Sequence, residues 1–249
     1  MLEETIEHIQ AEFQKSFHIE AGDFIEGIDK MPLNELILIN DKFLHPYLNF
    51  VKEHKHIYRA NTHKGLIFSL GILCSGAAIL FKDQNVPLTE EGLFAMEQRM
   101  VSVSLRQELE RLCRNEAQRT HGEQVFARYG AKGVRGEALS GYPSVRTLAL
   151  PVIAAGIKEG RDWNTVKLQT LCTLMSQVED SNILSRRDEP TLSRVQDTFQ
   201  KFLGEGGAYQ KDGEQKLKEL DDQFIRENIS PGGRADLLAV SILVTRLPL

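Results

Sequence analysis

The stretch that decides the fold is "ENISPGGRADLLAVSILVTRL", residues 227–247. Ser230 is a preferred helix N-cap, Pro231 suits the next position, and the apolar run from Leu237 would form the body of a helix over 230–247. Gly232 and Gly233 are unusual in a first turn, because each glycine costs a helix about 1 kcal/mol relative to alanine.

The rest of the chain has the same helical character. Apolar residues recur at steps of three and four, as on one face of an amphipathic helix, and strand-type alternation is nearly absent. The further expected helices cover 2–17, 32–51, 64–81, 89–115, 143–160, 164–178, 190–203 and 213–228. Pro151 should bend the helix at 143–160, and Asn164 should cap the helix at 164–178. The predicted fold is all-α, a single compact multi-helix domain with glycine-rich connecting loops.

Composition excludes several classes of function. The chain has 249 residues, 41% apolar and 26% charged, with a net charge of −5, so no nucleic-acid surface is expected. The apolar run at 66–81 is too short and interrupted for a membrane span, and no signal pattern is present. The three cysteines lie far apart and are expected to be reduced core thiols in a cytoplasmic protein. A homo-oligomer is compatible with this composition.

The two glycines of the opening stretch would leave a bare backbone at a helix start. Gly232 and Gly233 place no Cβ in front of the free N–H groups, so a phosphate could approach closely. Arg234 could reinforce such a site. Asp236, one turn further, would repel a phosphate unless a divalent cation lay between them. The alternative is a tight helix–helix crossing that needs small residues.

A second polar stretch is "ANTHKG", residues 60–65. Asn61 or Thr62 can cap a helix, and Lys64 can bind a phosphate as a point charge. His63 could donate or accept a proton near neutral pH. The alternative for His63 is a capping or surface residue.

A third stretch is "GVRGEALSGYPSVR", residues 133–146. Arg135 and Glu137 are expected in a glycine-flanked loop that leads into a helix, with Arg146 one turn inside that helix. A flexible backbone with guanidinium groups suits a polyanion. The alternative is an exposed loop with a surface ion pair.

A fourth stretch is "VEDSNILSRRD", residues 178–188. Glu179 and Asp180 are expected to close an apolar helix, where acids are unfavourable for the helix dipole. Such acids suggest another need, for example to hold a metal ion, although charge runs are usually solvated faces. Together, the four stretches indicate a site for a phosphorylated ligand and Mg²⁺.

These stretches, in this order, resemble the triphosphoribosyl-dephospho-CoA synthase family, of the CitG/MdcB type. The resemblance is carried by "NTHKGLIFSLGILC", "GVRGEALSGYPSVRTLALP", "DSNILSRRD" and "NISPGGRADLLA", which span about 61–249. It divides the chain into an atypical N-terminal helical segment at 1–57 and a synthase-like helical domain at 58–249. Two motifs that usually precede NTHKG in the family are not found in residues 1–60.

The resemblance implies a transferase that joins ATP to 3′-dephospho-CoA. The 2′-hydroxyl of dephospho-CoA would attack C1 of the ATP ribose, adenine would leave and the triphosphate would be retained. The product would be the prosthetic-group precursor for the acyl carrier protein of citrate lyase or malonate decarboxylase. The implied partners are ATP, 3′-dephospho-CoA and the transferase that passes the product on, with neither nucleic acid nor membrane among them.

The resemblance also suggests residue roles. Glu137 or His63 would act as acid and base, and Asp180 and Asp236 would hold Mg²⁺. The residues expected to bind the nucleotide are Asn61, Thr62, Lys64, Arg135, Arg146, Arg186, Ser230, Gly232 and Gly233. Two alternatives remain open: a diverged member that binds a nucleotide or CoA-like ligand without this activity, and an all-α interaction module without a small-molecule site.

Overall fold

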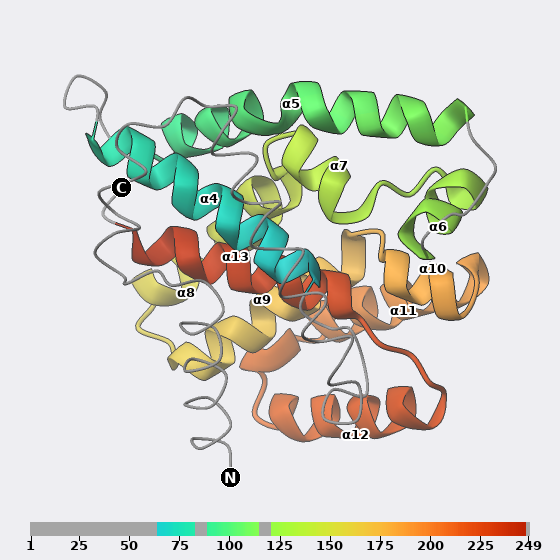
Figure 1. The fold of residues 1–249 in the computed structure, drawn as a ribbon. Coiled ribbons are helices and arrows are strands. Elements are labelled where there is room, and N and C mark those ends of the chain that lie inside the picture. The colour runs from blue at the N-terminus through green and yellow to red at the C-terminus, as the bar shows by residue number, and fades with distance from the viewer. Residues whose placement is uncertain (1–63, 83–88, 115–120, 248–249) are drawn as a thin grey trace, which may run out of the picture.

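A computed structural model describes residues 64–82, 89–114 and 121–247. Every regular element in these residues is a helix, which confirms the all-α prediction (Figure 1). The α-helices are α4 (Lys64–Lys82), α5 (Glu90–Arg114), α6 (His121–Tyr129), α7 (Gly133–Leu139), α8 (Leu150–Lys158), α9 (Trp163–Gln177), α10 (Ser181–Arg186), α11 (Glu189–Gly204), α12 (Gly213–Arg226) and α13 (Gly232–Arg246). A π-helical turn, η1 (Val145–Ala149), and a 3₁₀ turn, η2 (Gly207–Tyr209), complete the order.

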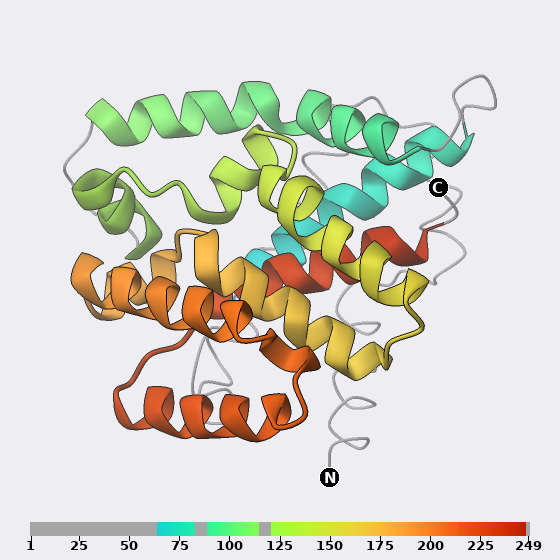
Figure 2. The same cartoon turned by 180° about the vertical axis from the view of Figure 1, so that it is seen from behind.

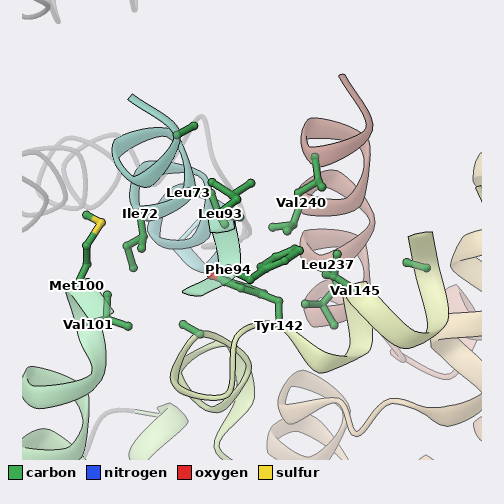
Figure 3. Packing of buried hydrophobic residues seen from close by; sticks show 14 of the residues in the cluster. Ile72, Leu73, Leu93, Phe94, Met100, Val101, Tyr142, Val145, Leu237 and Val240 are labelled. Carbon is green, nitrogen blue, oxygen red and sulfur yellow. The ribbon is translucent and has the colours of Figure 1, made fainter. Parts of the chain in front are cut away.

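Two hydrophobic clusters hold these helices together. In the first, α4, α5 and α13 pack around fully buried residues such as Leu73, Phe94 and Val240 (Figure 3). In the second, Phe224 of α12 packs against Phe199 of α11, and α11 packs against α9. Helix α9 lies between α8 and α11 when the molecule is seen from behind (Figure 2), so it connects the two clusters.

Helix ends depend on local side chains. Asp162 caps α9, because its side chain accepts a hydrogen bond from the N–H of Thr165 at 3.0 Å. The cap predicted at Asn164 is therefore wrong by two residues. Asp188 caps α11 in the same way, through the N–H of Thr191 at 2.9 Å.

Where a bend was predicted at Pro151, the structure has the π-helical turn η1 just before the proline. Pro151 has no N–H, and its ring would clash with the carbonyl of Thr147 in a regular α-helix. The wider π turn at Val145–Ala149 comes directly before the proline, and α8 continues after it.

Some predicted features are wrong or lie outside the described residues. The short helices α6, α7 and α10 were not predicted, and the glycine-rich connection at 204–215 contains the turn η2. Of the cysteines expected in the core, Cys172 is buried but Cys74 is exposed. The helices predicted at 2–17 and 32–51, and the side chain of Cys113, lie outside the described part of the chain. None of the described helices is long and apolar enough to cross a membrane.

The first cluster also contains one buried acid. Glu97 on α5 is 0% exposed, and neither of its carboxyl oxygens has a hydrogen-bond partner. Burial raises the pKa of Glu97 to about 9 from the ordinary value of 4.5. The native protein therefore holds a proton on Glu97 near neutral pH.

We predict that Glu97 makes stability fall as pH rises. Between pH 4.5 and about 9 the native state keeps a proton that the unfolded state has lost. The free energy of unfolding should therefore decrease with pH across this window. Glu97→Gln should flatten that slope in urea titrations at a series of pH values. The exposed Glu110→Gln on the same helix should leave it unchanged, and an equal slope in all three proteins would contradict the prediction.

Candidate active site

The first turns of α4, α7, α10 and α13 meet in one place (Figure 1). Gly65, the second residue of α4, lies against the carboxyl group of Asp236 on α13 so closely that a Cβ would collide with it. Gly133, the first residue of α7, has a left-handed backbone, and a Cβ there would lie 3.1 Å from Ser181 Oγ on α10. Glycine is therefore needed at both contacts.

The first two residues of α13 make the remaining contacts with α10. A Cβ on Gly232 would lie 3.0 Å from Asn182 Nδ2, and one on Gly233 would lie 3.5 Å from both carboxyl oxygens of Asp180. These glycines thus leave their backbone open toward the start of α10. From the sequence, a bare backbone at Gly232 and Gly233 and a close helix–helix crossing were alternatives. The structure has both, because α13 begins with these glycines and lies close to α10.

Asp180 is the N-cap of α10. Its Oδ1 accepts hydrogen bonds from the N–H groups of Asn182 at 2.8 Å and Ile183 at 3.4 Å. It does not close the preceding helix, as was predicted, because α9 ends at Gln177. The negative charge therefore lies at a favourable helix start. Asp180 is 1% exposed, and its second oxygen, Oδ2, has no hydrogen-bond partner.

Arg234 stabilises the turn between α9 and α10 and does not reach a phosphate. The prediction that it reinforces an anion site is wrong, because the side chain is 0% exposed. Its Nε and Nη2 donate hydrogen bonds to the carbonyl oxygen of Val178 at 3.1 and 2.6 Å. Its Nη1 lies 3.9 Å from Asp180 Oδ2. A fully buried guanidinium thus accompanies the buried carboxylate.

Asp236, which is half-buried on α13, adds a second carboxyl group near Asp180. Burial raises its pKa to about 7, and the negative charge of Asp180 contributes to the increase. Two carboxyl groups that repel each other, one with a buried oxygen that accepts no hydrogen bond, fit a divalent cation. The described residues contain no group of three side chains that could hold a metal ion, so a cation here would take further oxygens from a phosphorylated ligand.

Glu137 lies on α7, close to the same helix starts. The prediction that Arg135 and Glu137 belong to a loop is wrong, because both are within Gly133–Leu139. Glu137 accepts hydrogen bonds from the hydroxyl of Ser144 at 2.6 Å and from its N–H at 3.2 Å. Burial raises the pKa of Glu137, and the two bonds from Ser144 partly offset the effect. A half-buried carboxyl with a raised pKa is suited to proton transfer.

Other predicted site residues fall into three groups. Lys64 begins α4 and therefore lies at the converging helix starts. Ser230 is half-buried just before α13, but it does not cap that helix: the N-cap position is Pro231, without a side-chain hydrogen bond. Asn61, Thr62 and His63 lie outside the described residues.

Two predicted arginines lie elsewhere. Arg146 is exposed on η1, 5.6 Å above the ring of Phe94, and it lines a groove of about 770 Å³ that also includes Val244 near the end of α13. Arg186 is exposed at the last position of α10, at the opposite end from Asp180. The structure therefore does not bring either arginine to the helix starts.

Sequence reasoning missed several residues of the site. Their signals were present in the quoted stretches: Gly65 and Ser144 are second residues of the helices expected at 64–81 and 143–160, and Ser181 and Asn182 come shortly after the helix expected at 164–178. The missed residues are Gly65, Gly133, Ser144, Ser181 and Asn182.

We predict that Arg234→Met lowers the free energy of unfolding by about 3–5 kcal/mol, because it leaves the charge of Asp180 buried without compensation. Arg194→Met, which removes an exposed ion pair with Glu227, should cost less than about 1 kcal/mol. Adding Asp180→Asn to Arg234→Met should recover part of the loss, since asparagine also caps helices. Urea unfolding measures all three, and strictly additive effects of the two substitutions would contradict a coupled pair.

Comparison with known proteins is consistent with this geometry. A family model described as "CitG: ATP:dephospho-CoA triphosphoribosyl transferase" matches residues 47–249. The 2-(5″-triphosphoribosyl)-3′-dephosphocoenzyme-A synthase of Klebsiella pneumoniae is 38% identical over 193 residues, which cover 76% of this chain and 61% of that protein. The protein of the same name from Pectobacterium atrosepticum is 39% identical over 188 residues, 76% of this chain and 60% of its own.

The chain thus spans about three fifths of the length of the curated relatives that it matches. No solved structure matches it. The family model, however, covers well over half of the chain, including all four stretches that form or surround the converging helix starts. The protein therefore belongs to the CitG family of ATP:dephospho-CoA triphosphoribosyl transferases.

Proposed function

We propose that the protein transfers the triphosphoribosyl group of ATP to 3′-dephospho-CoA, giving 2′-(5″-triphosphoribosyl)-3′-dephospho-CoA and adenine. The observation that carries the proposal is the meeting of the first turns of α4, α7, α10 and α13 around the buried Asp180 and the half-buried Asp236. A triphosphate with a divalent cation has the charge distribution that this arrangement fits. Membership of the CitG family supports the identity of the substrates.

The helix starts would bind the triphosphate. First-turn N–H groups and the helix dipole both favour an anion, and Gly232 and Gly233 keep the backbone of α13 accessible. Lys64 and Arg135 would add positive charge from α4 and α7. These residues would hold the phosphates away from the reacting sugar carbon.

Asp180 and Asp236 would hold Mg²⁺ together with phosphate oxygens. Carboxylates and phosphates are the usual oxygen ligands of Mg²⁺, and the ion would neutralise the triphosphate and fix its position. The cap hydrogen bonds to Asp180 Oδ1 leave Oδ2 as the oxygen available to the cation. Arg234 Nη1 lies 3.9 Å from this oxygen and so does not occupy it by a hydrogen bond.

Glu137 would transfer a proton. The reaction removes a proton from the attacking 2′-hydroxyl and delivers one to the departing adenine. A carboxyl whose pKa is raised by burial can hold a proton closer to neutral pH, and Ser144 fixes its orientation through two hydrogen bonds. His63 remains the second candidate for this role from the sequence.

The product would serve as the prosthetic-group precursor for the acyl carrier protein of citrate lyase or malonate decarboxylase. A partner transferase would pass it on in the cytoplasm. The support for this step is the chemistry of the product, which carries a triphosphate leaving group on a CoA-derived arm.

The proposal is tested by incubating the protein with ATP, Mg²⁺ and 3′-dephospho-CoA and detecting adenine and the joined product by mass spectrometry. Both should appear in equal amounts, and neither should form when dephospho-CoA is omitted. A folded sample that is stabilised by ATP but forms neither compound would instead indicate a family member that binds the nucleotide without this chemistry.

We predict that Glu137→Gln lowers kcat by about 10²- to 10⁴-fold, because a general acid–base group contributes a factor of this size. Thermal stabilisation by ATP should remain, since the helix starts are unchanged. Glu159→Gln, an exposed substitution on the surface beside α8, is the matched control and should retain full activity. Equal rates for the two variants would exclude Glu137 from proton transfer.

We also predict that Asp236→Asn raises the Mg²⁺ concentration needed for half-maximal adenine release by at least about tenfold. Asp221→Asn, on the exposed face of α12, should leave it unchanged. Calorimetric titration of MgATP into the dephospho-CoA-free protein gives a second readout. An unchanged Mg²⁺ dependence in Asp236→Asn would remove this residue from the metal site.

A further inference from the structure

Beside the candidate active site, three buried residues have polar atoms without hydrogen-bond partners. They are Ser69 on α4, Glu97 on α5 and Tyr142 in the turn between α7 and η1, and each is 0% exposed. Both carboxyl oxygens of Glu97 and the hydroxyls of Ser69 and Tyr142 lack a hydrogen-bond partner in the protein. Polar atoms that lose water and gain no hydrogen bond destabilise a fold, so such a group needs an explanation.

The three side chains come together from different elements. The rings of Phe94 and Tyr142 lie 6.1 Å apart, tilted by 45° to each other, in the first cluster (Figure 3). Glu97 follows Phe94 by three residues, so it lies on the same face of α5. Burial raises the pKa of Tyr142, the neighbouring Ser69 hydroxyl lowers it, and the neighbouring Glu97 raises it further.

Ordered water is the partner that these atoms fit. A buried water usually makes about three hydrogen bonds to otherwise unsatisfied groups. Two hydroxyls and a carboxyl offer both donors and acceptors, because Glu97 is protonated near neutral pH. An apolar enclosure of Leu73, Leu93 and Phe94 would isolate this water from solvent.

Tyr142 also has an unusual backbone. Its φ of 52° is in the left-handed region, which costs energy for a residue with a side chain and persists only where the surroundings hold it. Its N–H donates a hydrogen bond to the carbonyl of Glu137 at 2.7 Å, and its carbonyl accepts one from the N–H of Arg146 at 3.0 Å. Tyr142 thus joins α7 to η1.

Helix α5 holds the other side of this turn. Gln98, next to Glu97, donates a hydrogen bond from Nε2 to the carbonyl of Leu139 at 3.0 Å. It also packs against Gly141, whose φ is 70°. Ser144, two residues beyond Tyr142, donates two hydrogen bonds to the carboxyl group of Glu137, one from its N–H and one from its hydroxyl. A movement of Tyr142 would therefore change the orientation of Glu137.

We propose that Ser69, Glu97 and Tyr142 enclose a site for ordered water, and that this site holds the strained turn that positions Glu137. Tyr142 and Glu97 then act as positioning residues, since neither is accessible to a substrate. The water site stands on the buried polar atoms alone. The effect on catalysis rests on the proposed function.

Tyr142→Phe tests the proposal because it removes only the hydroxyl. Tyr209→Phe is the matched control: its hydroxyl also lacks a hydrogen-bond partner, but it lies on η2, outside the site. Tyr142→Phe should lower Tm by about 2–4 °C, and the control should leave Tm unchanged. It should also lower kcat at least about tenfold at unchanged KM for ATP, because Glu137 is misaligned while the phosphate site is intact.

Glu97 supplies a second pair of variants. Glu97→Gln keeps hydrogen-bonding capacity and shape, so it should retain most of kcat, whereas Glu97→Met should lose it as Tyr142→Phe does. Amide hydrogen exchange over residues 137–146 gives a readout that needs no turnover. Exchange there should accelerate in Tyr142→Phe and Glu97→Met and remain slow in Glu97→Gln and Tyr209→Phe.

The outcomes separate the parts of the proposal. An unchanged or higher Tm in Tyr142→Phe would overturn the water site. A lower Tm with unchanged kcat and unchanged exchange would overturn the positioning role. If the wild-type protein releases no adenine, the proposed function fails, and Tm and amide exchange still decide whether the water site holds the turn.

Discussion

The buried contact of Arg234 with the turn between α9 and α10 is the interaction on which the site depends. Through Val178 and Asp180, it joins the first turn of α13 to the start of α10. Without this connection, the glycines of α13 would have no fixed neighbour, and Asp180 would carry an uncompensated charge in the interior. The guanidinium of Arg234 thus accompanies the buried carboxylate of Asp180. Asp236 has no such partner among the side chains that the structure describes, and its pKa is raised.

Long amphipathic helices could be predicted from the sequence because their apolar stripes extend over several turns. The helices expected at 64–81, 89–115 and 190–203 agree with α4, α5 and α11 to within a few residues. Helices α7 and α10 could not be predicted in this way. Each is only about two turns long and is stabilised by contacts between distant segments, such as that of Gly133 with Ser181.

The candidate site was predictable in its residue types and less so in its geometry. Paired glycines and acids near helix ends indicated a phosphate and a cation, and Gly232, Gly233 and Asp180 do lie together. The direction of Arg234 could not be deduced, because which face of α13 is buried depends on the helices packed against it. The sequence gives no sign of Glu97 either, since a buried acid looks like any surface acid on a charged helix such as α5.

Helix α9 gives the fold one further property. It contributes Leu174 to the first hydrophobic cluster and Cys172 and Met175 to the second, from faces only a few residues apart. Both clusters therefore share one helix, which couples them. Unfolding should be cooperative across both clusters. A variant that loosens α12 would therefore also weaken, through α9, the converging helix starts of the candidate site.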